Sequence, residues 1–442
     1  MRIVPSAAML AVVAVAGIPA LTLLFADVWP IPAAAVLAVL LGAVLLDAAR
    51  GRRALSQVQV AGPQLVRLWK DRAGSIEFTF RCKDQRGRNV RIAPVLADEM
   101  GAATEDKVVT LPAGVEFSRI EWTCKPVKRG QYFLNHFAVE TASPLRLWQA
   151  RALLPLETEI RVYPNLASEQ KNAPNLFLRR PQTGLRIHRQ VGKGREFEKL
   201  REYSPGDGFD EIDWKATARR GHPITRVFQV ERTQEVYIVL DSSRLTARPL
   251  GDEQTGILER NITASLLLAL AAEKRGDLFG LVTFSDRVHG FVRARNGKGH
   301  YGACREALYT LEPRIVSPDF DDVCTMLRLK LRRRALIVFL TELDDPVLAE
   351  SFVQNIHLLR RQHLVIVGMA KPAGAQPLFK GKQAESVDDV YRDLAGHLLW
   401  TKLRELAKGL EHQGVQFAML DPGREGLQLA SLYADIKQRQ LL

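Results

Sequence analysis

The chain has 442 residues, with 62 lysines and arginines against 49 aspartates and glutamates, which gives a formal net charge of +13. This length exceeds what one hydrophobic core normally supports, so two or three domains are expected. The positive charge invites a nucleic-acid interpretation, but no helix-turn-helix, zinc-finger or aromatic RNA-binding motif accompanies it. We therefore expect no nucleic-acid binding, and we attribute the charge to a basic face on an anionic membrane.

Two uncharged apolar runs, residues 3–25 and 28–46, open the chain. Each is close to the roughly 20 residues that a membrane-spanning helix needs. Asp27, Trp29 and Pro30 would form the turn between them. A cleaved signal peptide is the alternative, but it would leave the second run unexplained.

Basic residues set the expected orientation. Arg2 precedes the first run and the cluster at 50–53 follows the second, and such residues mark cytoplasmic ends. Residues 1–53 are thus predicted to form a transmembrane helical hairpin. The protein would be a two-pass protein of a bacterial inner (cytoplasmic) membrane, with its other domains facing the cytoplasm.

Residues 54–165 show period-two alternation broken by glycine, proline and aspartate turns, which indicates antiparallel strands. Their number and spacing favour a small β-sandwich. The expected strands are 75–82, 89–92, 107–111, 117–124 and 131–140. Ser143, Pro144 and Leu145 follow them and are interpreted as a structural turn.

Residues 166–232 are rich in charges of both signs and are interpreted as a connector with ordered turns. Their distinctive part runs from Gly194 to Arg219 and holds Leu-Arg-Glu-Tyr, Pro-Gly-Asp and Asp-Trp-Lys-Ala-Thr-Ala-Arg in that order. The residues of this signature that we single out are Tyr203, Gly206, Asp207, Asp213, Trp214, Lys215 and Arg219. Trp214 is expected to pin the connector by burial, with Lys215 and Arg219 paired to nearby aspartates. A docking surface for a partner is the alternative.

Strand and helix patterns alternate over residues 233–442, which predicts a parallel, doubly wound sheet. The expected strands are 236–240, 279–284, 335–340, 364–369 and 415–420, and the expected helices between them are 257–274, 301–311, 322–330, 347–360 and 394–411. The signature followed by this pattern resembles the domain-of-unknown-function-58 family, over roughly residue 166 to the C-terminus. Members of that family join the signature to a von Willebrand factor A-like domain.

The candidate site lies where two of these strands end, because ligands of open parallel sheets bind at the carboxyl ends of the strands. Metal-binding A-like domains carry Asp-x-Ser-x-Ser after the first strand and Asp after a central strand. Asp241 and Ser243 match this pattern, whereas Leu245 replaces the second serine and Glu342 replaces the aspartate. Too few oxygen ligands remain for the octahedral geometry that magnesium demands, so we expect no cofactor and a degenerate metal site at Asp241, Ser243 and Glu342. Magnesium bound at this degenerate site is the alternative.

We expect the same strand ends to form an acidic rim that binds a partner protein through Asp241, Ser243, Glu342 and Asp344. The family resemblance implies a MoxR-type AAA+ ATPase and a transglutaminase-like membrane protein as partners. The predicted function is a membrane-anchored scaffold or adaptor, without enzymatic activity, in the assembly or maturation of a protein complex. The alternative is a metal-dependent hydrolase acting at the strand ends.

Overall fold

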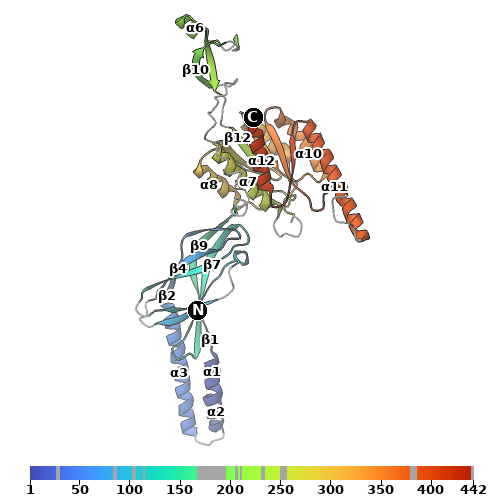
Figure 1. The fold of residues 1–442 in the computed structure, drawn as a ribbon. Helices are drawn as coiled ribbons and strands as arrows, with labels where there is room; N and C mark the ends of the chain where they lie inside the picture. The colour runs from blue at the N-terminus through green and yellow to red at the C-terminus, as the bar shows by residue number, and fades with distance from the viewer. Residues whose placement is uncertain are drawn as a thin grey trace. The chain divides into compact units, whose positions relative to one another are not determined.

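The computed structural model describes residues 1–25, 30–82, 87–101, 106–112, 115–166, 196–204, 208–209, 212–229, 234–248, 256–378 and 386–439. They fall into two compact units, Met1–Asn165 and Leu166–Leu442 (Figure 1). Asp27 and Trp29, predicted to form the turn of the hairpin, lie outside the described residues.

The first unit begins with two long apolar helical segments. The first, Ala7–Phe25, comprises α1 (Ala7–Val12), a π-helical turn (Val13–Gly17) and α2 (Ile18–Phe25), and the second is α3 (Pro30–Ser56). Their mean hydropathy values are 2.4 and 2.3, and both are long and apolar enough to cross a membrane.

The start of the first predicted span is wrong. Residues 2–5 form strand β1 (Arg2–Pro5), which pairs antiparallel with β9 (Trp148–Tyr163). The helix begins only after Ser6, whose side chain accepts a hydrogen bond from the amide of Met9 at 3.3 Å. Such a serine N-cap satisfies a helix-end donor that would otherwise lack a partner, so it fixes where the helix starts.

Two β-sheets complete the first unit. One has the order β1-β9-β8-β5-β6, with β3 parallel to β9, and the other has the order β2-β4-β7. Their buried side chains form one common core, in which the rings of Phe78 and Phe137 meet edge to face at 4.9 Å. The remaining strands are β2 (Val58–Ala61), β3 (Leu65–Trp69), β4 (Gly74–Cys82), β5 (Arg88–Pro94), β6 (Lys107–Leu111), β7 (Phe117–Cys124) and β8 (Gly130–Ala142), and a short 3-10 helix spans Asp98–Met100.

Strand β9 was not among the predicted strands, although it is 16 residues long. Pro155 interrupts its pattern, and proline within a run argues against a strand in sequence-based prediction. In the structure, Pro155 lies opposite His136, beside a register shift in β8 between Leu134 and His136. The irregularity accommodates the proline, as β-bulges commonly do.

In the second unit, the described part of the connector forms a small module. Strands β10 (Glu196–Glu202) and β11 (Ile224–Gln229) pair antiparallel, and the short helix α6 (Trp214–Arg220) lies between them in the chain. The connector therefore holds regular structure as well as the turns expected there.

The rest of the second unit is an α/β domain with a six-stranded sheet of order β14-β13-β12-β15-β16-β17. Five strands are parallel, but the edge strand β14 is antiparallel to β13, so the sheet is mixed and the fully parallel prediction is wrong. A short turn joins β13 to β14, and only antiparallel strands allow such a connection. The strands are β12 (Glu235–Asp241), β13 (Leu278–Phe284), β14 (Val288–Arg295), β15 (Ala335–Leu340), β16 (Leu364–Ala370) and β17 (Gln416–Leu420).

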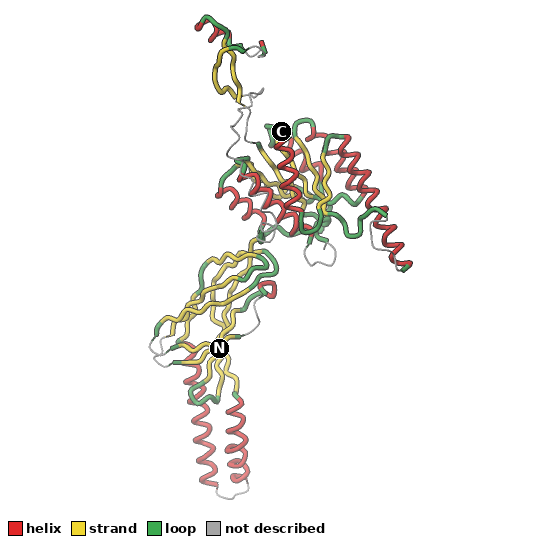
Figure 2. The backbone as a smooth tube through the Cα atoms, viewed as in Figure 1, coloured by secondary structure: helices red, strands yellow, loops and turns green. Residues whose placement is uncertain are grey.

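Helices cover both faces of this sheet, as Figure 2 shows, and each face has its own hydrophobic core. One core holds side chains from α9, α10 and α11, and the other from α7, α8 and α12. The helices are α7 (Ile257–Lys274), α8 (Lys298–Leu308), α9 (Phe320–Lys330), α10 (Pro346–Arg360), α11 (Val387–His412) and α12 (Glu425–Gln438). Helix α12 was not predicted, and its buried Glu425 is held by Arg260 of α7 at 3.1 Å.

Candidate functional site

Asp241 is the centre of the candidate site. It ends β12, whose preceding residues are buried hydrophobics, and its own side chain is fully buried. The Thr341 hydroxyl donates a hydrogen bond to Asp241 Oδ2 at 2.6 Å, and the Ser243 amide donates to Oδ1 at 2.7 Å. Both carboxylate oxygens therefore already have partners within the protein.

The turn after β12 holds itself together through its own hydroxyls. Ser243 Oγ accepts a hydrogen bond from the Leu245 amide at 3.3 Å. The Thr246 hydroxyl donates to the carbonyls of Asp241 and Ser243, at 3.2 and 3.1 Å. Leu245 itself is buried. At the position where a second serine would offer an oxygen ligand, the side chain of Leu245 thus packs into the core.

Glu342 follows β15 and is buried beside this turn. Its Oε1 accepts a hydrogen bond from the Ala370 amide at 3.0 Å. Burial is the main cause that raises the pKa of Glu342 to about 8. The charges of Asp344 and Asp241 contribute to this rise, whereas the Ala370 hydrogen bond and the charge of Arg248 oppose it. Burial also raises the pKa of Asp241, although Thr341 and Ser243 hydrogen-bond its carboxylate. The site accordingly favours the neutral form of Glu342 at pH 7.

Asp344 is paired within the chain. Arg248 donates two hydrogen bonds to it, from Nη1 at 2.8 Å and from Nη2 at 3.0 Å. Burial opposes ionisation of Asp344, but this bidentate contact lowers its pKa overall. Sequence reasoning missed Arg248, and only its position a few residues after the Asp-x-Ser turn could have drawn attention to it.

These contacts change the expected acidic rim. Asp241, Ser243 and Glu342 are buried, so they do not form the exposed acidic rim that was expected, whereas the binding of a partner protein at these residues stays a prediction. Arg248 of the same chain takes the place expected for the partner's cation, and Asp344 keeps 24% of its side chain exposed. Asp241, Ser243 and Glu342 are buried because the turns that follow β12 and β15 cover the ends of the two strands.

The donor set does not fit a magnesium ion. Among the described residues, no group of three or more histidine, cysteine, aspartate or glutamate side chains is placed to hold a metal. Asp241 and Ser243 supply oxygens, but those oxygens accept hydrogen bonds from Thr341, the Ser243 amide and Leu245. Glu342 is directed to the Ala370 amide instead. Magnesium requires near-ideal octahedral coordination by oxygens, which this arrangement lacks.

The signature residues lie apart from these contacts in the chain, on β10, α6 and the turns beside them. Asp213 caps α6 by accepting a hydrogen bond from the Ala216 amide at 3.0 Å, and its other oxygen lies 3.5 Å from Arg226. The rings of Tyr203 and Phe209 stack at 6.3 Å. Gly206 and Asp207 lie outside the described residues.

Trp214 is 67% exposed, so the prediction that it pins the connector by burial is wrong. It is the first residue of α6, and Asp213 caps that helix by hydrogen bonding instead. Asp213 lies beside Arg226, and Asp207 and Asp210, the other aspartates predicted to pair with Lys215 and Arg219, lie outside the described residues. The alternative interpretation of these residues, a docking surface, remains a prediction.

The mixed sheet, with its antiparallel edge strand β14 and Asp241 at the end of β12, defines an α/β domain that resembles the von Willebrand factor A-like domain expected from the sequence. Residues 199–383 match the family described as "Protein of unknown function DUF58". This match confirms the family resemblance drawn from the signature, over a shorter stretch than the one expected.

Two proteins of similar sequence are themselves uncharacterised. "Uncharacterized protein Rv1480" of Mycobacterium tuberculosis is 25% identical over 180 residues, which are 40% of this chain and 54% of that protein. "Uncharacterized protein YeaD" of Bacillus subtilis is 28% identical over 119 residues, 26% of this chain and 29% of that protein. The match thus spans about half of the mycobacterial protein and less of the other.

Solved structures show a distant likeness. BatB from Bacteroides thetaiotaomicron is 14% identical, with a TM-score of 0.33, over 47% of this chain and 99% of that one. An aerotolerance-related membrane protein from Bacteroides fragilis is 12% identical, with a TM-score of 0.29, over 46% and 99%. The SpRpn10 VWA domain is 11% identical, with a TM-score of 0.28, over 45% and 94%.

Proposed function

We propose that this chain is a membrane-anchored scaffold or adaptor that binds another protein through helix α11. The observation that carries this proposal is an exposed apolar stripe on the N-terminal half of that helix. Its members recur at helical spacing and are 43–70% exposed. We call them the α11 stripe: Val387, Val390, Tyr391, Leu394 and Leu398.

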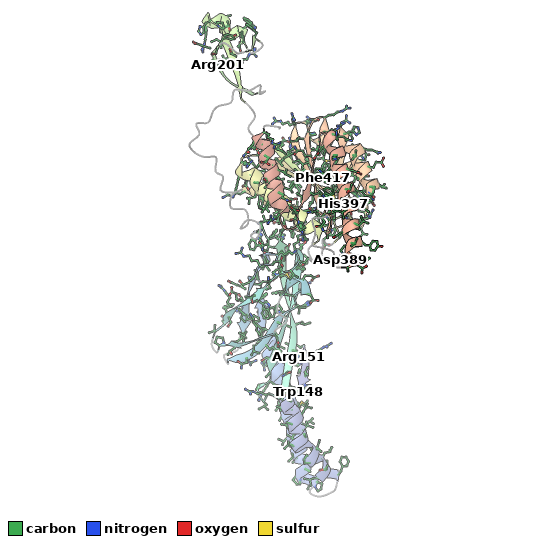
Figure 3. The ribbon with its side chains drawn as sticks, turned by 45° about the vertical axis from the view of Figure 1, so that its right-hand side comes forward. Trp148, Arg151, Arg201, Asp389, His397 and Phe417 are labelled. Atoms are coloured by element: carbon green, nitrogen blue, oxygen red, sulfur yellow. The ribbon has the colours of Figure 1, made fainter. Side chains whose placement is uncertain are left out.

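The two halves of α11 differ in what they contact. Leu403 and Leu410, in the second half, are buried in the core on one face of the sheet. In the first half, Gly396 lies so close to the loop at Gly374 that an added Cβ would come within 2.1 Å of its carbonyl oxygen. The helix is thus held at its middle and its end, while the stripe faces solvent. Asp389 and His397 mark this half of the helix in Figure 3.

Exposed apolar groups arranged in one stripe are a common feature of protein interfaces. Burying apolar surface contributes about 25 cal/mol per Å², so several such side chains suffice to anchor a partner. Asp388 and Asp393 flank the stripe. The chemistry that fits is therefore an apolar groove with basic residues along its rim. The family resemblance supports a MoxR-type AAA+ ATPase as the protein that carries this groove, with a transglutaminase-like membrane protein as a further partner.

Capture of a co-encoded MoxR-type ATPase by the full chain in detergent tests this proposal. Leu394→Asp should reduce capture about tenfold or more, because a charge would be buried without a partner at the interface. The matched control is Lys408→Asp, which places the same residue at an exposed position of α11 outside the stripe. Equal capture by both variants would exclude the α11 stripe as the binding surface.

We propose that the helices at the N-terminus anchor the scaffold as a two-pass hairpin in a bacterial inner membrane, with the two β-sheets of the first unit and the whole second unit in the cytoplasm. The two apolar helices support the anchor, and the arginines at 50–53 support the orientation. A reporter fused after Leu442 should behave as cytoplasmic. Periplasmic activity of that reporter would overturn the orientation and exclude a cytosolic ATPase as the partner.

The alternative of a hydrolase gains one observation, a serine and a histidine in contact. His289 Nε2 lies 2.6 Å from Ser285 Oγ, just after β13. However, Ser285 is fully buried, and its hydroxyl donates to Asp286 Oδ1 at 2.8 Å. Asp286 approaches the same ring nitrogen, at 3.6 Å, whereas an orienting carboxylate contacts the opposite nitrogen of a catalytic histidine. This geometry fits a structural turn better than a nucleophile, so we favour the scaffold.

A further inference from the structure

One face of α3 changes from apolar to basic along the helix axis. Leu45, Ala48, Ala49, Arg52 and Arg53 occupy positions i, i+3, i+4, i+7 and i+8 of the helix, so they lie on one face. This face and β1 enclose a groove of about 550 Å³, whose lining includes all five residues and Ile3. The rise of an α-helix places Leu45 and Arg52 about 10 Å apart along the axis.

The opposite face of the same helix is fixed to the β domain, by which we mean the two β-sheets of the first unit. Asp47 is buried there and accepts hydrogen bonds from the amides of Leu145 and Leu147, at 2.9 and 3.3 Å, and from the Ser143 hydroxyl. Trp148, labelled in Figure 3, donates from Nε1 to the Val44 carbonyl at 3.0 Å. These bonds set the rotation of α3 about its axis, so the groove is a constant feature of the unit.

Gly51 tightens the same joint. An added Cβ at this position would lie 3.2 Å from Cβ of Ser143, so the helix and the turn at Ser143 pack closely. Ala54 and Leu55 are buried on this side as well. The two arginines lie on the other side of the helix, in the lining of the groove, and both are exposed.

Two basic side chains at one end of an apolar groove match the chemistry of an anionic amphiphile. Within the part of the chain that the structure describes, neither Arg52 nor Arg53 forms an ion pair with an acidic side chain, so both charges are available to a ligand. The small side chains of Ala48 and Ala49 leave room beside the helix, and Leu45 continues the apolar surface toward the first half of α3. A free inorganic anion would use only the basic end, whereas a phospholipid would use the whole length.

We propose that this groove binds one anionic phospholipid. Its phosphodiester lies between Arg52 and Arg53, and an acyl chain runs over Ala48, Ala49 and Leu45. The proposal rests on the proposed membrane anchoring of α3. It differs from the general attraction of basic residues to anionic membranes, because it assigns a single lipid to one face of one helix. The bound lipid would fix the depth of α3 and, through the joint at Asp47, the height of the β domain above the membrane.

Native mass spectrometry of the full chain, released from nanodiscs of mixed phosphatidylglycerol and phosphatidylcholine, tests the proposal. The wild-type chain should retain one phosphatidylglycerol. Arg52→Gln with Arg53→Gln should weaken retention about tenfold or more, because both charges that face the phosphate are removed. The matched control is Arg2→Gln with Arg50→Gln, which removes the same charge from exposed positions outside the groove lining. Equal loss in the two double variants would overturn the proposal in favour of a diffuse charge effect.

A third variant distinguishes binding of a phospholipid from binding of free inorganic phosphate. Ala49→Phe keeps both arginines but fills the apolar part of the groove, so it should also lose the lipid. Retention by this variant, or displacement of the lipid by millimolar inorganic phosphate, would show that only the basic end binds and would overturn the lipid site. Capture of the ATPase through the α11 stripe is measured in detergent. Failure of the wild-type chain to capture the ATPase, together with normal lipid retention, would therefore count against the proposed function alone.

Discussion

The hydroxyl of Thr341 donates to the carboxylate of Asp241 across 2.6 Å, and this bond joins the ends of two neighbouring strands, β15 and β12. Both residues are buried. In a metal-binding A-like domain, the carboxylate at this place would be turned toward a cation. Here its oxygens accept hydrogen bonds from the protein, so the strand ends act as a structural joint.

Replacing Thr341 with valine should destabilise the α/β domain. The change removes the donor and leaves Asp241 buried with one partner fewer, which costs roughly 1–3 kcal/mol. Chemical unfolding of the wild-type and variant chains in urea measures the difference. Thr310→Val is the control, because Thr310 is exposed. An unfolding midpoint shared by all three chains would show that the bond between Thr341 and Asp241 contributes little.

Stability should fall as the pH rises from about 5 to 8, because the folded chain keeps a proton on Glu342 that the unfolded chain releases. The pKa of Glu342 is about 8 in the folded chain, against an ordinary value of 4.5. Unfolding therefore releases a proton within this window, and each pH unit lowers the free energy of unfolding by up to about 1.4 kcal/mol. Below the lower value, both states hold the proton and the full stabilisation is present.

Glu342→Gln isolates this effect, since glutamine keeps the acceptor for the Ala370 amide and does not titrate. The variant should show a smaller slope between pH 5 and 8 and greater stability than the wild-type chain above pH 8. Some slope of the same sign should remain, because the pKa of Asp241 is raised as well. Thermal unfolding across this range provides the measurement. Identical slopes in both chains would place Glu342 in a less buried environment than the one described.

Asp47→Ala should loosen the joint between α3 and the β domain. It removes the acceptor for the amides of Leu145 and Leu147, and each buried donor left without a partner costs roughly 1–3 kcal/mol. Hydrogen exchange at these two amides should become faster in detergent-solubilised protein. Asp98→Ala, at an exposed position of the β domain, should leave it unchanged. Unaltered protection in Asp47→Ala would mean that packing alone holds the joint.

Magnesium should bind weakly or not at all. Leu245 and Glu342 stand where metal-binding A-like domains offer serine and aspartate, and the oxygens of Asp241 accept hydrogen bonds from the protein. Calorimetric titration of the full chain should show no saturable binding below about 1 mM magnesium. Micromolar affinity that disappears in Asp241→Ala would show instead that the site rearranges around a metal.

The sequence by itself determined the local elements whose pattern is strong. The two apolar runs predict helices, and the buried runs ending at Asp241 and Leu340 predict strands, because length and periodicity are properties of the chain alone. The signature likewise identified the family. The strand pattern also predicted that Asp241 and Glu342 would lie at the carboxyl ends of strands, and the structure makes those two strands, β12 and β15, neighbours.

Only the tertiary structure decided which of these residues are exposed to solvent and which contact each other. The exposure of Trp214, the burial of Glu342 and the contact of Arg248 with Asp344 depend on how distant segments fold over one another. The direction of β14 and the contact of Asp47 with Ser143, 96 residues away, depend on the same long-range packing. Periodicity reports only which face of an element is apolar. The partners of a polar side chain are set by three-dimensional proximity, because burial makes an unpaired polar group costly and the fold determines which donors lie within reach.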